Sequence, residues 1–243
     1  MKEAFEKKYH DVEKKHWWFK SRRHCIQKWL GHASRESRIL DIGCSSGLLL
    51  TELRQMGFAA ENLYGIDISQ SAVDNAKKNG LQNVFVCDAQ NINIEQQFDY
   101  ILASDCLEHL ENDQVALKNW LRLLNPCRQA IIFVPAFMSL WSQHDLANMH
   151  FRRYTRNELK IKIASAGFSI KHSGYWNVLL FIPVFLYRGL SRLLYSKEKA
   201  HGDISQPPQF VNLFLIKWLT FENYLLKSVP FPFGVSTYCI AKK

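Results

Sequence analysis

The sequence has no apolar run long enough to cross a bilayer as a helix. Its longest run, VLLFIPVFLY from Val178 to Tyr187, is shorter than the ~20 residues that a spanning helix needs, and Pro183 interrupts it. Internal repeats and low-complexity tracts are absent too. A membrane-spanning helix and a repeat architecture are therefore excluded. Apolar residues make up 47% of the 243 residues, which allows a large core in one α/β domain with additions.

The six cysteines include no CxxC pair, so the usual spacing of zinc and redox motifs is missing. We expect them to be small buried side chains in a reducing compartment. The N-terminal stretch MKEAFEKKYHDVEKKHWWF is charged and lacks the apolar core of a signal peptide. Together these features predict a cytoplasmic protein.

Acidic residues are fewer than basic ones, since 22 Asp and Glu against 31 Lys and Arg leave a net charge of +9. This excess favours anionic partners, whether phosphates, nucleic acid or an acidic membrane surface, and it does not choose among them. The imbalance is steeper over 152–199, where Glu158 and Glu198 are the only acids.

Strand and helix patterns alternate along most of the chain. Such alternation predicts an α/β fold, here a seven-stranded, mostly parallel sheet with helices on both faces. Gly57 and Gly80 stand where helices are expected to stop, and Thr155 with Glu158 has the spacing of a capping box. The expected strands cover 38–42, 62–67, 83–87, 99–104, 129–134, 168–174 and 234–243, and the expected helices cover 18–31, 47–57, 70–79, 111–124 and 155–167.

Four segments are expected along the chain. Residues 1–35 form an N-terminal helical lid, 36–175 the core, 176–232 a helical insertion or cap, and 233–243 the closing strand of the core. The insertion is rich in aromatic residues and leucine, and two helices joined by a polar loop are predicted for it. It suits a cap over an apolar acceptor, a peripheral contact with an anionic membrane, or a homodimer interface.

The stretch SRILDIGCSSGLLL, residues 37–50, indicates a strand, a glycine loop and a helix, by which α/β proteins bind nucleotides. The dinucleotide fingerprint GxGxxG is missing, and no Lys completes a triphosphate-binding loop. Instead Asp41 precedes the loop, Asp67 ends the next strand and Asp88 follows the third. A carboxylate before the loop suits a cation and would repel a pyrophosphate. The indicated ligand is a nucleoside with a positively charged extension and no phosphate.

Four stretches in order, ILDIGCSSG, YGIDIS, VFVCDAQNI and FDYILASDCLEHL, resemble the first four motifs of the class I, seven-strand S-adenosylmethionine-dependent methyltransferases. The resemblance covers about 36–135 and is to a bacterial branch with small-molecule acceptors. It implies a Rossmann-like fold and S-adenosylmethionine as the cofactor, with S-adenosylhomocysteine as the product. Ser45 stands where the family usually has a glycine, and it is tolerable there if its backbone avoids positive φ.

The resemblance also implies a set of cofactor contacts. Asp67 is expected to bind the ribose hydroxyls, Ile68 and Asp88 to face the adenine, and Asp41 to line the methionine end. The full set of implied cofactor-binding residues is Asp41, Gly43, Cys44, Gly47, Asp67, Ile68, Asp88, Ala89 and Ser104.

The loop after the fifth expected strand, VPAFMSLWSQHDLANMHFRRYT, holds the candidates for catalysis. His144 or His150, with Asp145 between them, is expected as the base that removes a hydroxyl proton. Arg153 and Tyr154 offer anion and ring contacts to the substrate. Equally, Asp145 or His150 could satisfy backbone groups and hold the loop shut. No metal site is expected, because two His and one Asp at this spacing are weak evidence.

Residues before and after the glycine loop complete the expected site. Trp17–Phe19 is expected to form a lid over the cofactor pocket, with Trp17 against the substrate. Glu108 and His109 follow the fourth strand, where they could contact substrate or simply begin the next helix. Arg22 or Arg23 could pair with the methionine carboxylate or lie on the surface.

The predicted activity is methyl transfer from S-adenosylmethionine to a small or lipid-like acceptor. Oxygen is the first choice of accepting atom, because a His in the loop can take a hydroxyl proton. Two alternatives stay open: methylation of RNA or DNA, and S-adenosylmethionine binding without catalysis. Nucleic acid is the less favoured partner, since no NPPY-type tetrad follows the fourth strand.

Overall fold

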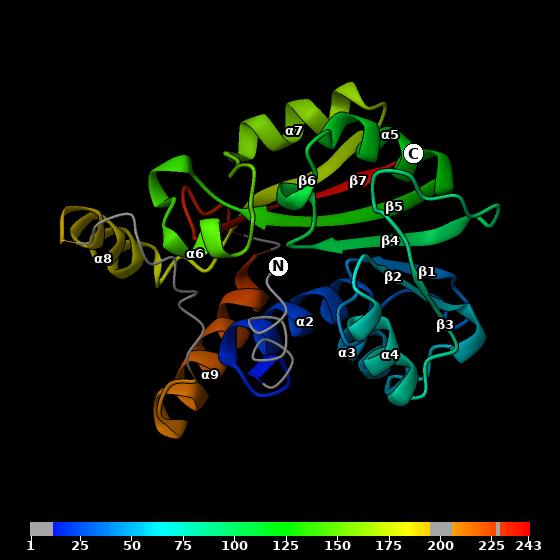
Figure 1. Ribbon diagram of the computed structural model, residues 1–243, viewed down its shortest axis with the longest axis horizontal. Helices are drawn as coiled ribbons and strands as arrows, with labels where there is room; N and C mark the ends of the chain where they lie inside the picture. Colours follow the sequence, from blue (N-terminus) through cyan, green and yellow to red (C-terminus); the bar gives the residue numbers. More distant parts are fainter. Residues whose placement is uncertain (1–11, 195–205, 227–228) are drawn as a thin grey trace.

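The computed structural model describes residues 12–194, 206–226 and 229–243, with the elements labelled in Figure 1. The strands form one seven-stranded sheet in the order β3-β2-β1-β4-β5-β7-β6. β7 runs antiparallel to both of its neighbours, and the other pairs are parallel. The expected α/β fold is confirmed. The strands are β1 (Ile39–Ile42), β2 (Leu63–Asp67), β3 (Asn83–Val86), β4 (Phe98–Ser104), β5 (Leu124–Pro135), β6 (Ser169–Trp176) and β7 (Ser236–Lys242).

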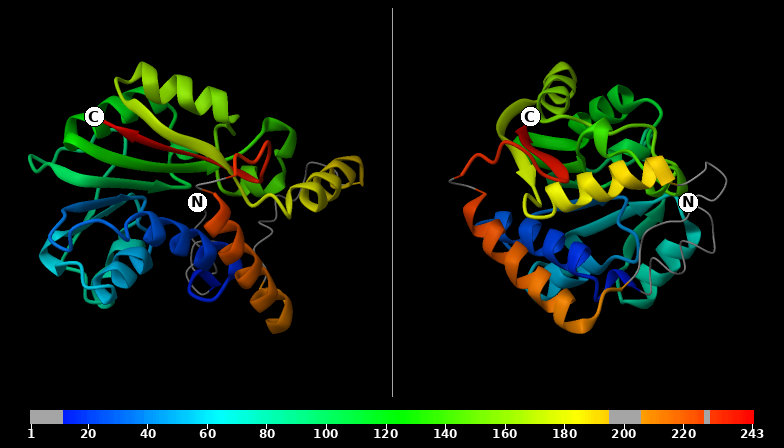
Figure 2. Two further views of the ribbon diagram at one scale, coloured as in Figure 1. Left: turned by 180° about the vertical axis from the view of Figure 1, so that it is seen from behind. Right: turned by 90° about the vertical axis from the view of Figure 1, so that its left-hand side faces the viewer.

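Helices cover both faces of the sheet and bury an apolar core beneath each (Figure 1). One face carries α5 (Asp113–Leu123) and α7 (Arg156–Ser165), and the other carries α2 (Trp17–Trp29), α3 (Leu48–Gln55), α4 (Gln70–Lys78) and α9 (Gln209–Leu225). Short helix α6 (Gln143–Ala147) lies in the loop after β5, and α8 (Phe181–Leu194) projects from the end of the sheet (Figures 1 and 2). The described residues also include three short 3-10 helices: η1 (Ala60–Asn62), η2 (Leu107–His109) and η3 (Met138–Leu140).

The expected elements are present with small shifts. α8 and α9 are the two helices predicted for the insertion, while part of the polar link between them and the first part of the N-terminal lid lie outside the described residues. β5 begins at Leu124 instead of 129, because Leu124 pairs with Phe98 across a register shift in β4. α6 and the 3-10 turns were not expected, since each is too short to show a periodic pattern.

Local chemistry explains where several helices begin and end. Thr155 and Glu158 form the expected capping box, with the Thr155 N–H donating to Glu158 Oε2 at 2.7 Å. Ser69 caps α4 by accepting a hydrogen bond from the Ala72 N–H at 3.2 Å. Gly57 and Gly80 follow α3 and α4 with φ of 94° and 82°, a region that favours glycine.

The strand order reverses at β1, which pairs with β2 on one side and β4 on the other. Loops that leave such strands diverge and open a crevice at the carboxyl end of the sheet. The glycine loop turns at once there, because the N–H groups of Gly43 and Cys44 both donate to the Ile66 carbonyl, at 2.8 and 3.0 Å. The topology therefore brings the ends of β1, β2 and β4 to one place.

Gly47 combines a left-handed backbone with a crowded position, so its replacement should harm the fold in two ways. Its φ is 72°, and a Cβ there would lie 2.3 Å from Leu81 Cδ1. Gly57 also has positive φ, but a Cβ there would meet nothing within 4 Å. Gly57→Ala should therefore lose about 1–2 kcal/mol of unfolding free energy from φ alone. Gly47→Ala should lose about 1–3 kcal/mol more from overpacking. Urea unfolding measures the loss of unfolding free energy in both variants. Equal losses would contradict the expected overpacking of a Cβ at Gly47 against Leu81.

Candidate active site

A cavity of about 1060 Å³ opens at the carboxyl ends of β1, β2, β4 and β5. Its volume is at the upper end of the range for ligand pockets in proteins, so it could hold a nucleoside cofactor together with an acceptor. Expected site residues that line it are Trp17, Gly43, Asp67, Ile68, Asp88, Ala89, Ser104, Glu108, His109, His144, His150 and Arg153.

Five expected residues lie behind the cavity wall. Gly47 begins α3 against Leu81 and does not line the cavity, and Cys44 packs in the apolar core against Gly65. Tyr154, expected to contact substrate, is buried instead, and its hydroxyl donates to Asp113 Oδ2 at 3.0 Å. Burial and the Asp113 charge raise the pKa of Tyr154 above its usual range. Asp41 and Asp145 are the other two, and both are buried carboxyl groups next to the site.

The middle residue of the glycine loop has a strained backbone. Ser45 has φ of 50°, so the condition under which the sequence made a serine tolerable there is not met. Hydrogen bonds hold this conformation: the Ser45 N–H donates to Asp67 Oδ2 at 2.9 Å, and the Ser45 hydroxyl donates to Glu13 Oε2 at 3.1 Å. The Ser69 N–H donates to the other Asp67 oxygen at 2.9 Å, so Asp67 joins the loop to the end of β2.

The glycine loop is surrounded by acids. Asp41 is buried, and its desolvation, with the nearby charges of Glu13 and Asp67, raises its pKa to about 8. Three carboxyl groups crowded together repel one another, and a cation among them would lower this electrostatic cost. The residues present therefore fit the positively charged methionine end of S-adenosylmethionine.

Arg22 is buried beside the end of β4, whereas the sequence left open whether it lies on the surface. Its guanidinium donates to Asp105 Oδ2 at 3.1 Å and to the Ser236 hydroxyl at 2.7 Å. The same group lies 4.2 Å from the ring centre of Phe133, a cation–π contact. Arg23 is also buried and pairs with Glu52 at 3.0 Å. Neither arginine is a solvated surface charge.

The Asp145 carboxylate organises the loop after β5. Its Oδ1 accepts from Arg153 Nε at 2.7 Å and lies 2.9 Å from His150 Nδ1, and its Oδ2 accepts from the Ser142 N–H at 2.8 Å. Although Asp145 is fully buried, these partners hold its pKa well below the usual range. Asp145 is therefore ionised, and a His150 that donates from Nδ1 keeps Nε2 as a proton acceptor.

Two other histidines line the same part of the cavity. Burial, followed by the charge of Arg188, lowers the pKa of His144 to about 3. Burial, followed by the neighbouring His150, lowers the pKa of His109 to about 3. Both imidazoles are neutral near pH 7 and are weak bases.

Glu108 is a fully buried carboxyl group that lines the cavity. Neither of its side-chain oxygens has a hydrogen-bond partner in the described part of the chain. Burial and the Asp105 charge raise the pKa of Glu108 well above its ordinary value, which favours the protonated form. A buried, unpartnered carboxyl group of this kind indicates a ligand that would complete its hydrogen bonds.

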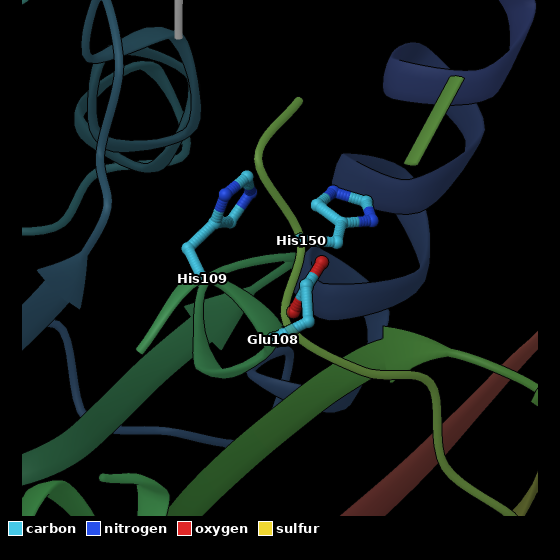
Figure 3. A group of neighbouring side chains, drawn as sticks. All are labelled: Glu108, His109 and His150. Atoms are coloured by element: carbon cyan, nitrogen blue, oxygen red, sulfur yellow. The ribbon is translucent and has the colours of Figure 1, made fainter. Parts of the chain in front are cut away.

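Glu108, His109 and His150 point toward one another (Figure 3). Their potential ligand atoms all lie within 4.8 Å of one another, so these are the side chains that could hold a metal ion. The sequence predicted that Glu108 and His109 could contact substrate, but it did not predict that they lie next to His150. The absence of a metal stays a prediction.

The reversed strand order, the glycine loop and the acids around it define a class I, S-adenosylmethionine-dependent methyltransferase fold. Residues 40–132 match the family model described as methyltransferase domain, so this part of the chain is similar to that family. No helix of the described residues is long and apolar enough to cross a membrane.

Known proteins agree with this family. The ubiquinone biosynthesis O-methyltransferase of Rickettsia conorii is 32% identical over 99 residues, which are 39% of this chain and 33% of that protein. The chain thus spans about a third of the length of this curated relative. A methyltransferase structure from Archaeoglobus fulgidus covers 99% of this chain and 98% of its own, with 19% identity and a TM-score of 0.59. Phosphoethanolamine N-methyltransferase 2 of Haemonchus contortus, solved with S-adenosylmethionine, covers 91% of this chain and 52% of its own, with 17% identity and a TM-score of 0.59.

Asp67→Ala should weaken the binding of S-adenosylhomocysteine by about 1–3 kcal/mol, because hydrogen bonds to a buried ligand are lost. Asp74→Ala, which removes an exposed acid on α4, is the matched control and should leave affinity unchanged. Calorimetric titration measures both variants, and thermal unfolding checks that the loop held by Asp67 is intact. Unchanged affinity in a folded Asp67→Ala protein would refute the ribose contact.

Asp41 should make the ligand-free protein less stable as pH rises. Its folded-state pKa of about 8 exceeds its ordinary value, so the folded chain holds this proton more tightly than the unfolded chain does. Unfolding free energy should therefore decline from about pH 5 to 8, by at least about 1.4 kcal/mol more than in Asp41→Asn. Urea unfolding across that range measures the difference, and parallel pH profiles of the two proteins would argue against the raised pKa.

Proposed function

We propose that this protein transfers the methyl group of S-adenosylmethionine to a hydroxyl oxygen of an apolar, small or lipid-like acceptor. The observation that carries the proposal is the pair formed by Asp145 and His150, 2.9 Å apart, at the wall of the cavity. A carboxylate that orients an imidazole is the usual arrangement for a general base. The name of the curated relatives, O-methyltransferases of ubiquinone biosynthesis, supports oxygen as the accepting atom.

The walls of the cavity support an apolar acceptor. Leu180, Val184 and Tyr187 line it on the side of α8, and Trp17 and Phe151 line it elsewhere. Such side chains bind an acceptor by removing its apolar surface from water. The protonated carboxyl group of Glu108 would donate a hydrogen bond to a polar group of that acceptor.

When bound, S-adenosylmethionine supplies a methyl group on a positively charged sulfur. His150 Nε2 accepts the proton of the acceptor hydroxyl as the oxygen gains its methyl group. The imidazolium that forms is stabilised by Asp145, whose ionised state depends on Arg153. The apolar lid around Trp17 excludes water, which would otherwise compete as the nucleophile.

His150 suits the role of base better than His144. The pKa of His144 is about 3, so its imidazole would have little tendency to take a hydroxyl proton. His144 also lacks the carboxylate contact on Nδ1 that orients His150, because its Nδ1 has no partner in the described residues.

His150→Gln should lower methyl transfer by about 100-fold or more, while His144→Gln should lower it by less than about tenfold. Both variants should bind S-adenosylhomocysteine as the wild type does. Methyl-labelled S-adenosylmethionine incubated with a bacterial lipid extract, or with total RNA as the alternative acceptor, provides the assay.

Three outcomes would count against the proposal. Equal losses in both variants, together with lower thermal stability, would assign these histidines to loop structure alone. Label in the RNA fraction would favour nucleic acid methylation. S-adenosylhomocysteine binding without any label transfer from either extract would favour a binding protein without catalysis.

A further inference from the structure

Helix α9 buries three of its polar side chains and exposes six large apolar or aromatic ones. Asn212, Glu222 and Asn223 are 7%, 4% and 0% exposed, although polar residues normally face water. The opposite face of the helix consists of large apolar and aromatic side chains. They are Phe210, Leu213, Phe214, Trp218, Phe221 and Tyr224, each at least 38% exposed.

Specific bonds fix α9 in this orientation. Asn223 accepts from Trp176 Nε1 at 2.8 Å and donates to the Ser21 carbonyl at 3.0 Å. Glu222 accepts from the Val178 N–H at 3.1 Å. Rotating the helix to bury its apolar face would leave these buried groups without partners, at a high cost. The outward apolar face is therefore a consequence of the fold.

Helix α8 presents a second apolar surface at the same end of the molecule. Ile182, Leu186 and Leu190 are 58%, 63% and 57% exposed, while Val184 on its other side lines the cavity. The right-hand view of Figure 2 looks onto this end, and both α8 and α9 cross it. We name the exposed faces of α8 and α9 together the apolar end face.

The charges around the apolar end face are positive. The sequence of α8 contains no acid, and the one acid of α9, Glu222, is buried. Lys217 is exposed on α9, and Lys14 and Lys15 are exposed where Asn212 donates to the Lys15 carbonyl. Within the described parts of α8 and α9, the apolar end face has an exposed lysine and no exposed acid, which complements an anionic lipid surface.

We propose that the apolar end face docks on the surface of an anionic lipid bilayer, with α8 and α9 lying in the interface. Their lengths of 14 and 17 residues suit this position, and no helix of the described residues could span the bilayer. Trp218 and Tyr224 are of the residue types enriched at membrane interfaces. A second copy of the chain fits less well, because a two-fold contact would bring the lysines of both copies into one interface, where the described parts of α8 and α9 offer no exposed acid to pair with them.

Docking would place the α8 wall of the cavity next to the bilayer. A lipid-like acceptor could then reach Val184 and Tyr187 without crossing water. The docking itself stands apart from the proposed methyl transfer, since it depends on neither His150 nor the cofactor. Failure of one proposal therefore leaves the other testable.

Flotation of the full-length protein with vesicles tests the docking. The vesicles are phosphatidylcholine, with or without phosphatidylglycerol. The wild type should float with the anionic vesicles and less with the neutral ones. The double variant Phe214→Ser, Phe221→Ser should lower partitioning at least about tenfold. Lys217→Glu should weaken binding to the anionic vesicles only.

Ile161→Ser is the matched control, because Ile161 is a 66% exposed apolar residue on α7, across the sheet. It should float like the wild type. Unaltered S-adenosylhomocysteine affinity in all variants would show that the fold and the cofactor site are intact. Flotation that is absent in the wild type, or equal in the double variant and the wild type, would overturn the proposal. A dimer in sedimentation that the double variant dissociates would do so too, by assigning the face to a second copy.

Discussion

The buried carboxylate of Asp145 holds together the part of the site on which the proposed methyl transfer depends. It joins Arg153, His150 and the start of α6 in one network, so the loop after β5 has one low-energy arrangement. Loss of the carboxylate would leave the Arg153 guanidinium buried without its counter-charge, which is far costlier than losing a surface ion pair. The same network answers two questions at once. It satisfies the Ser142 N–H and so holds the loop, which one interpretation of the sequence expected of Asp145, and it also fixes the position of His150 Nδ1, which the sequence did not indicate.

Burial favours the neutral form of the ionisable groups at both ends of the cavity, and their surroundings then decide what each end can bind. At the glycine loop several carboxyl groups lie together, so a positively charged ligand would lower the cost of ionising Asp41. At the far end Glu108 favours its protonated form and His144 is neutral, which suits an uncharged acceptor. A cationic methyl donor and a neutral hydroxyl compound are the pair of ligands that this division of charge favours.

Much of the fold could be predicted from local patterns, because helix stops such as Gly57 and the Thr155 capping box act within a few residues. The meeting of Gly43, Asp67 and Ser104 followed from parallel topology. The direction of individual side chains could not be predicted from these patterns. Tyr154 and Arg153 are neighbours in sequence, yet Tyr154 faces Asp113 and Arg153 faces the cavity. Ser45 has positive φ through bonds to Asp67 and Glu13, which are distant in sequence. An amphipathic pattern likewise defines two faces for α9 without saying which of them is buried.

The central claim is that the crevice between β1 and β4 binds an adenosine with a positively charged extension and no phosphate. Calorimetric titration of the purified wild-type protein with S-adenosylhomocysteine, and with NAD as the control, tests it most directly. We expect saturable one-site binding of S-adenosylhomocysteine and no binding of NAD, because a pyrophosphate would face Asp41, Asp67 and Glu13. Binding of NAD, or of neither compound, would contradict it.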